Sequence, residues 1–295
     1  MGTTPAPPGE AVALLTSQTG EPTAIQVLSD RRGSRAWKLQ GPNRAVALKA
    51  NNPDGDNARD KAAEMAQEDD NLLRLTAAGA LHADYRVSAG TWDGGRWLAV
   101  NWIDGAPLWR ALAPARGPEG DRASVRPSLA GIARTWTEHL ALMHAAGWVH
   151  ADVQPTNTLV TSGGHAAVID YALACGPDDA HRRVPHRGAL THTTAPELAT
   201  QILDTPADTH IQAQPPADIW SLGASLFWCW TGHRPVPYAD DLDRPGKLAV
   251  IARGTTTALR DVRPWPFPAF ENAITACLAP DPADRPTAKE LTTAW

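Results

Sequence analysis

The chain has few cysteines, which excludes two kinds of stabilising site. Cys175, Cys229 and Cys277 are its three cysteines, and they lie far apart without the C-x-x-C spacing of a zinc site. An odd number of scattered cysteines also provides no disulfide framework. We therefore expect a protein of a reducing, cytoplasmic compartment.

Long hydrophobic runs and an excess of positive charge are missing too. No apolar run approaches the roughly 18 residues that a membrane-spanning helix needs, and the N-terminus lacks the basic-then-apolar pattern of a secretion signal. The formal net charge is -5, whereas nucleic acids and membrane surfaces are bound by basic faces. We expect a soluble protein with no nucleic-acid and no membrane partner.

The length of the chain allows more than one folding unit. With 295 residues it exceeds one average domain, and lobes of about 85 and 190 residues could each bury a core. Residues 1–20 begin with many Pro, Gly and Thr residues and are expected to form a mobile tail. Residues 21–105 and 106–295 are then the two expected lobes.

The apolar patterns differ between these two parts. In the first, short strands are expected at residues 24–28, 36–39 and 45–50, a helix at 58–76 and an apolar strand at 96–103. The second reads as mainly helical, with an apolar stripe at helical spacing from Leu129 to Met143. Further helices are expected at 216–230, 247–253, 270–278 and 288–295. Residues 158–160 and 166–169 are expected to pair as a hairpin.

One stretch carries the chemistry. His150-Ala151-Asp152-Val153-Gln154-Pro155-Thr156-Asn157 is followed by Asp170-Tyr171-Ala172. Two carboxylates and an amide stand where a magnesium-dependent phosphoryl transfer needs them. Asp152 would orient a hydroxyl and accept its proton, while Asn157 and Asp170 would hold the metal.

Other motifs occur in a fixed order around this stretch. They are Val46-Ala47-Leu48-Lys49, Ala195-Pro196-Glu197, Asp218-Ile219-Trp220-Ser221-Leu222-Gly223 and Asp284-Arg285-Pro286. Together with the loop they resemble the eukaryotic-like (Hanks-type) Ser/Thr protein kinase family. The resemblance implies an α+β fold with a small β-rich lobe and a larger, mainly helical lobe. It also implies ATP and Mg²⁺ as cofactors and transfer of the γ-phosphate to a protein or peptide hydroxyl.

The resemblance also assigns roles to residues of the first lobe. Lys49 would grip the phosphates of the nucleotide, steadied by Glu68, although Glu64 lies on the same helix face. Val100 would control access to the back of an adenine pocket, and the backbone from Asn101 to Ile103 would offer hydrogen bonds to the base.

Three residues are given bracing roles by the same resemblance. His150 would pack beneath the metal-binding aspartate, Asp218 would cap backbone amides of the catalytic loop, and Arg285 would pair with Glu197.

Several positions depart from the family pattern. Gln154 stands where the family has a lysine that steadies the transferred phosphate, and Ala151 replaces an arginine that couples activity to loop phosphorylation. Gly33 is the one glycine left in the glycine-rich loop, where Arg31, Arg32 and Arg35 could supply charge instead or could simply be solvated. Leu190 replaces a threonine that contacts the catalytic aspartate. These departures put recognition of an ordinary Ser/Thr peptide in doubt.

Two other functions remain open on the sequence alone. One is a small-molecule or biosynthetic kinase. The loop at residues 150–157 resembles that of aminoglycoside phosphotransferases, which also have no lysine at the place of Gln154. A catalytically weak pseudokinase that serves as a binding module is the other. The acceptor, whether protein, peptide or small molecule, is not identified by any motif.

Overall fold

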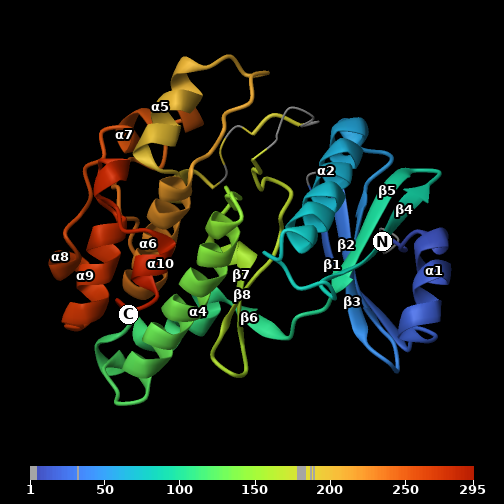
Figure 1. The fold of residues 1–295 in the computed structure, drawn as a ribbon, viewed down its shortest axis with the longest axis horizontal. Helices are drawn as coiled ribbons and strands as arrows, with labels where there is room; N and C mark the ends of the chain where they lie inside the picture. The colour runs from blue at the N-terminus through green and yellow to red at the C-terminus, as the bar shows by residue number, and fades with distance from the viewer. Residues whose placement is uncertain (1–4, 32, 178–183, 187, 189) are drawn as a thin grey trace. The chain divides into compact units, whose positions relative to one another are not determined.

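The computed structural model describes residues 5–31, 33–177, 184–186, 188 and 190–295 (Figure 1). The chain divides into two compact units, and the division falls between Trp102 and Ile103. The sequence placed this boundary slightly later, after residue 105.

The first unit is built on one antiparallel sheet with the strand order β1-β2-β3-β5-β4. Its strands are β1 (Ala24–Arg31), β2 (Ser34–Gln40), β3 (Ala45–Asn51), β4 (Arg86–Trp92) and β5 (Gly95–Asn101). Alternate residues of β3, namely Val46, Leu48 and Ala50, are fully buried, as expected for a sheet with one face on the core. Trp37 and Leu39 of β2 pack into the same cluster.

A helix lies where the sequence suggested a tail. Residues Gly9–Thr19 form α1, in which Ala11 and Leu15 stand four apart and are both fully buried in the cluster with Trp37. The expectation of a mobile tail is therefore wrong for this segment, because the Pro- and Gly-rich start of the chain masked a short apolar helix face. Residues 1–4 of the expected tail lie outside the described residues.

The second helix of this unit is α2 (Ala58–Ala77), which agrees closely with the helix expected at residues 58–76. Met65, Glu68, Leu72 and Leu75 are buried and recur at helical spacing, so they face the sheet. Strand β4 was not foreseen. Six of its seven residues are half-buried, so it lacks the clear alternation that marks a strand in the sequence.

The second unit is mainly helical and carries a small sheet in the order β6-β7-β8. The strands are β6 (Gly105–Pro107), β7 (Thr158–Thr161) and β8 (Ala166–Val168), and the expected pairing of β7 with β8 is observed. The helices are α3 (Leu108–Ala111), α4 (Val125–Ala145), α5 (Pro196–Asp204), α6 (Pro215–Thr231), α7 (Arg244–Ile251), α8 (Leu259–Val262), α9 (Pro268–Cys277) and α10 (Ala288–Leu291).

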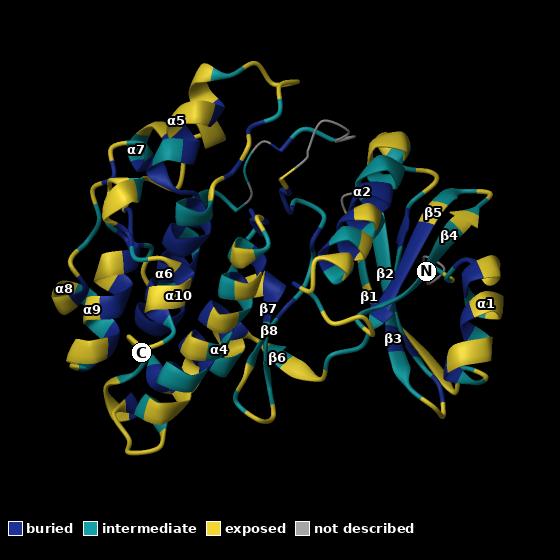
Figure 2. Ribbon diagram, in the orientation of Figure 1, coloured by how far each residue is buried: buried dark blue, intermediate teal, exposed yellow. Residues whose placement is uncertain are grey.

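Helix α6 forms the centre of the second unit. It is buried along most of its length, as its dark blue ribbon in Figure 2 shows. Trp220 and Trp230 are nearly inaccessible to solvent, so these tryptophans pack in the core. A Cβ on Gly223 would lie 2.6 Å from the Cβ of Cys277, so glycine allows α9 to approach α6 closely.

Helix α4 presents the expected apolar stripe. Leu129, Ile132, Trp136, Leu140 and Met143 are all buried. The C-terminal end of α4 leads toward residues 150–157, the expected catalytic loop. Packing of the stripe therefore fixes where the catalytic loop begins. Among the described residues, no helix is long and apolar enough to cross a membrane.

Candidate active site

An ion pair connects strand β3 to helix α2 in the first unit. The ammonium of Lys49 donates to both carboxylate oxygens of Glu68, at 2.8 and 3.0 Å, and Glu68 is only 3% exposed. Glu64, the alternative partner on the same helix face, bonds instead to Lys61. The expected pairing of Lys49 with Glu68 is thus observed, while their contact with nucleotide phosphates stays a prediction.

Gly33 lies in the tight turn that joins β1 to β2. Arg31 pairs with Ser34 across the turn, and Gly33 has a φ of +75°. A Cβ at this position would lie 2.2 Å from the side-chain oxygen of Asn57, so both conformation and space require glycine. Arg35 pairs with Asp30 at 3.2 Å, and Arg32 lies outside the described residues.

The end of β5 holds the residues expected to contact a base. Val100 is 6% exposed. The backbone N–H of Asn101 donates to the carbonyl of Tyr85 at 2.8 Å, and that of Trp102 donates to the carbonyl of Ala45 at 3.1 Å. These two donors are therefore used within the first unit. Ile103 is the first residue of the second unit, and its expected hydrogen bond to a base stays a prediction.

In the catalytic loop of the second unit, two neutral side chains donate hydrogen bonds to the carboxylate of Asp152. The side-chain nitrogen of Gln154 donates to one carboxylate oxygen at 2.5 Å, and that of Asn157 donates to the other at 2.7 Å. Burial, followed by the negative charge of Asp170, raises the pKa of Asp152 to about 8, against the two hydrogen bonds that lower it. Asp152 is therefore a carboxylate with an unusually high affinity for a proton.

Asp170 follows strand β8 and has a left-handed backbone conformation, with a φ of +67°. The backbone on both sides of it is fixed. The N–H of Ile169 donates to the carbonyl of Asn157 at 2.9 Å, and the buried ring of Tyr171 lies 5.1 Å from that of His150. The Tyr171 hydroxyl lies 3.0 Å from Nε2 of His139, whose pKa burial lowers to about 4.

Asp218 caps the start of the catalytic loop, as expected. Its two carboxylate oxygens accept the backbone N–H groups of His150 at 2.8 Å and Ala151 at 2.9 Å. Burial alone would raise the pKa of Asp218, but hydrogen bonds and charge, chiefly from His144, hold it below its ordinary value. Ala151 has a φ of +61°, a strained conformation for alanine, which Asp218 helps to maintain.

Two histidines that the sequence did not assign to the site contact this loop or the aspartate that caps it. His144, in the last turn of α4, lies 3.0 Å from Asp218 through Nε2. His186 is fully buried, with Nδ1 3.2 Å from the carbonyl of Ile211 and Nε2 3.4 Å from the carbonyl of Ala151. Neither stands in a motif with Asp152, so no spacing in the sequence pointed to these contacts.

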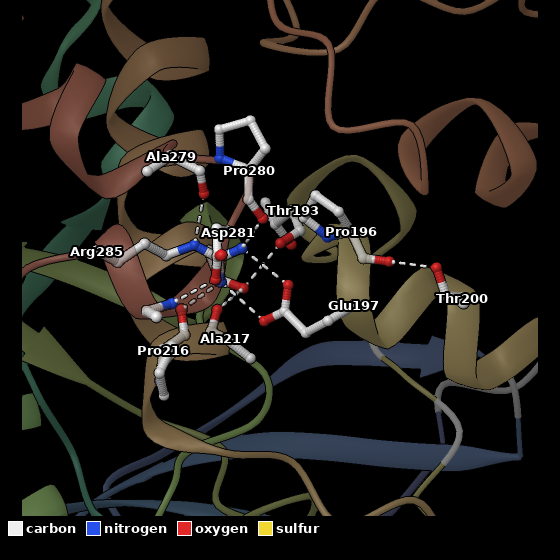
Figure 3. Close-up of polar contacts among 12 residues, drawn as sticks. Thr193, Pro196, Glu197, Thr200, Pro216, Ala217, Ala279, Pro280, Asp281 and Arg285 are labelled. Carbon is white, nitrogen blue, oxygen red and sulfur yellow. Dashed lines mark hydrogen bonds and ion pairs between the residues drawn. The ribbon is translucent and has the colours of Figure 1, made fainter.

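Arg285 makes the expected pair with Glu197. Its two terminal nitrogens bond to the two carboxylate oxygens of Glu197, both at 2.8 Å (Figure 3). The remaining donors reach the carbonyls of Ala279, Pro216 and Pro280. All five N–H donors of the guanidinium thus have acceptors, which ties α5 to the start of α6 and to the chain before α10.

Comparison with known proteins agrees with this geometry. The model of the protein kinase domain matches residues 42–295, which is most of the chain. The chain belongs to the protein kinase family. By that membership it is classed with the protein-kinase-like phosphotransferases.

The relatives of this kinase domain include bacterial and eukaryotic proteins. It is 30% identical over 230 residues to the serine/threonine-protein kinase PknL of Mycobacterium tuberculosis, covering 72% of the chain and 50% of PknL. PknK of the same organism is 30% identical over 249 residues, covering 83% of the chain and 20% of PknK. Serine/threonine-protein kinase 10-A of Xenopus laevis is 25% identical over 202 residues, or 68% of the chain and 20% of that protein. The chain thus spans half or less of these relatives.

The side chains of the second unit fit a magnesium ion of the kind that the family uses. Asp152 and Asp170 lie close enough for one carboxylate to raise the pKa of the other, so a cation between or beside them would relieve the repulsion. The amide nitrogen of Asn157 donates to Asp152, so the amide oxygen is the atom of this side chain that would contact a metal ion. Carboxylate and amide oxygens are the ligands that Mg²⁺ prefers.

Proposed function

We propose that the chain transfers the γ-phosphate of magnesium-ATP to a hydroxyl group of a protein or peptide. The observation that carries this proposal is the Asp152 carboxylate, buried beside Asp170 and held by Gln154 and Asn157. A base with a raised pKa and a fixed orientation is suited to align a hydroxyl and accept its proton. The names of PknL and PknK support a Ser/Thr protein kinase rather than another phosphotransferase.

Lys49 and Glu68 account for binding of the nucleotide. Lys49 is cationic and is held by two hydrogen bonds from its ammonium to Glu68, so its position is set before the nucleotide arrives. Its charge would contact phosphate oxygens. Glu68 is almost fully buried, so loss of Lys49 would remove a cationic partner from a buried carboxylate.

Asn157 and Asp170 would hold magnesium, which supplies positive charge to the phosphate oxygens during transfer. The hydrogen bond from Ile169 to Asn157 and the packing of Tyr171 fix these two ligands from the backbone side. Gln154 holds Asp152 and offers the phosphate a neutral donor where other family members place a cation. We infer a slower transfer than in kinases with that lysine, not its absence.

A transfer assay tests this proposal and separates it from its alternatives. The chain is incubated with magnesium and ATP labelled at the γ-phosphate, together with a protein and peptide mixture or with metabolites bearing hydroxyl groups. We expect label on protein or peptide, and a loss of roughly a hundredfold or more in Asp152→Asn, as when an acid-base group is removed. Asp208→Asn, at an exposed position of the same unit, is the matched control and should transfer at the parent rate.

Three outcomes contradict parts of the proposal. Label that appears on metabolites alone would indicate the small-molecule kinase. A parent protein that binds magnesium-ATP without transferring label would indicate the pseudokinase. Equal rates in the parent and in Asp152→Asn would remove Asp152 from the mechanism.

A further inference from the structure

The second unit contains a cavity that the proposed transfer does not use. It measures about 680 Å³ and lies between the C-terminal half of α4, the start of α6 and the start of α10. Small-molecule sites typically have volumes of roughly 300 to 1,000 Å³. The size of this cavity therefore suits a small molecule.

The wall of the cavity is mainly apolar. Helix α4 contributes Ala141, Leu142 and Ala145, and the other walls include Pro216, Ile219 and Ala288. Leu142 is 57% exposed, the largest exposed fraction among the large hydrophobic side chains of the described residues. An apolar ligand that covered Leu142 would remove this surface from water.

Two polar side chains of the wall, Arg285 and His144, are already paired with the protein. The five donors of Arg285 are taken by Glu197 and by three carbonyls, and His144 is bonded to Asp218. These groups cannot attract a charged ligand without losing existing partners. The interior of the cavity therefore favours an apolar group.

The rim of the cavity, in contrast, carries a cation. Lys289 is exposed, and no ion pair of its ammonium is found among the residues that the structure describes. Glu138, also at the rim, lies 3.9 Å from Arg134 on the same helix, so its charge is partly balanced. Lys289 is therefore the rim cation with which a negatively charged head group would pair.

We propose that this cavity binds an amphipathic molecule with an apolar chain and an anionic head, of the fatty-acid class. The chain would lie against Leu142, Ile219 and Ala288, and the carboxylate would pair with Lys289. This inference does not depend on the proposed transfer, because no residue of the cavity that would contact the ligand belongs to the catalytic loop.

Titration calorimetry with dodecanoate, below its micelle concentration, tests the site on the full chain. One molecule should bind per chain, and affinity should fall as the probe shortens to decanoate and octanoate, by up to roughly fourfold per methylene. Dodecyltrimethylammonium, which has the same chain and the opposite charge, should bind more weakly than dodecanoate.

Variants assign the binding to the cavity. Leu142→Asp should weaken dodecanoate binding by roughly tenfold or more, because a charge would be covered by the alkyl chain. Leu14→Asp is the matched control, since Leu14 is 48% exposed on α1 of the other unit, and it should bind as the parent does.

Lys289→Met should weaken dodecanoate binding by roughly fivefold while leaving the affinity for dodecan-1-ol within twofold of the parent's. Ala145→Trp, which would fill the cavity from an exposed position, should abolish binding.

Two results would overturn the proposal. One is dodecanoate binding that is unchanged in both Leu142→Asp and Ala145→Trp, in protein that melts at the parent temperature. The other is binding of dodecyltrimethylammonium as tight as that of dodecanoate, which would show that the rim does not select an anion.

Discussion

At the scale of single residues, the support of Asp152 distinguishes this chain from the family pattern. Gln154 and Asn157 donate to its two oxygens, and both donors are neutral. They orient the carboxylate, but they do not compensate for burial and for the charge of Asp170, so the pKa of Asp152 is raised to about 8. A lysine at position 154 would supply the same hydrogen bond together with a positive charge.

Gln154→Lys should therefore move the pH dependence of transfer. The base form of Asp152 is populated above its pKa, and a nearby cation lowers the pKa of a carboxyl group by roughly 1 to 3 units. We expect the acidic limb of the kcat/KM profile to shift to lower pH by about one unit or more, with a higher rate at pH 7. Gln201→Lys, at an exposed position on α5, controls for added charge and should leave the limb in place. An unchanged limb in Gln154→Lys would show that another group controls it.

Local spacing explains which residues of the candidate site could be predicted. Asp152, Gln154 and Asn157 lie within six positions of each other, so one motif identifies them together. Helix period places both Glu64 and Glu68 on the face toward Lys49, and the spacing typical of the family favoured Glu68. His144 bonds to Asp218, which is 74 positions away, and His186 contacts Ala151, which is 35 positions away. Both contacts depend on tertiary packing that no local pattern encodes.

At the scale of elements, α1 is the feature that composition concealed. Its apolar face consists mainly of Ala11 and Leu15, which complete the cluster around Trp37. The neighbouring Leu14 is 48% exposed, so two adjacent leucines have opposite environments. This pair allows the contribution of the helix to be measured.

Leu15→Ala should destabilise the first unit by about 2 to 5 kcal/mol, because a buried leucine is replaced by a cavity. Leu14→Ala should change its stability by no more than about 0.5 kcal/mol, as is usual for an exposed position. Urea unfolding, monitored by amide hydrogen exchange in β2, measures the stability of both variants. If the two variants unfold at the same urea concentration, α1 is not part of the cooperative core.

Elements with a strong apolar pattern or clear turns were predicted well, and weakly patterned ones were missed. Helices α2 and α4 have regular apolar faces, α6 is apolar along most of its length, and the first three strands and the hairpin of β7 and β8 adjoin clear turns. Strand β4 has no buried residue, and α10 ends at Leu291 although the sequence suggested a helix to residue 295. The end of the chain is held differently, by a hydrogen bond from the indole of Trp295 to the hydroxyl of Thr137.

At the scale of the whole molecule, contacts between distant segments stabilise the second unit. Arg285 and Glu197 are 88 positions apart, and the guanidinium is fully buried. Arg285→Met should lower the unfolding free energy of this unit by about 3 to 5 kcal/mol, because Glu197 would lose its cation and three backbone carbonyls would lose their donor. The double variant with Glu197→Gln should recover part of that loss. Thermal unfolding measures the series, and a loss below about 1 kcal/mol would mean that water replaces the pair at little cost.

Binding of magnesium-ATP should stabilise the molecule that carries the proposed site. At about 100 times its dissociation constant, a ligand that binds only the folded state adds about 2.7 kcal/mol. For a chain of this size, each kcal/mol raises the melting temperature by roughly 2 to 4 °C. Lys49→Met should reduce the shift, because it removes the cation that contacts the phosphates. Lys61→Met is its matched control, since Lys61 pairs with Glu64 on α2 and has no proposed role.

Asp170→Asn should reduce the part of the melting shift that depends on magnesium, because a charged ligand of the ion is lost. If the parent protein shows no shift at millimolar magnesium-ATP, nucleotide binding fails and the transfer proposal fails with it.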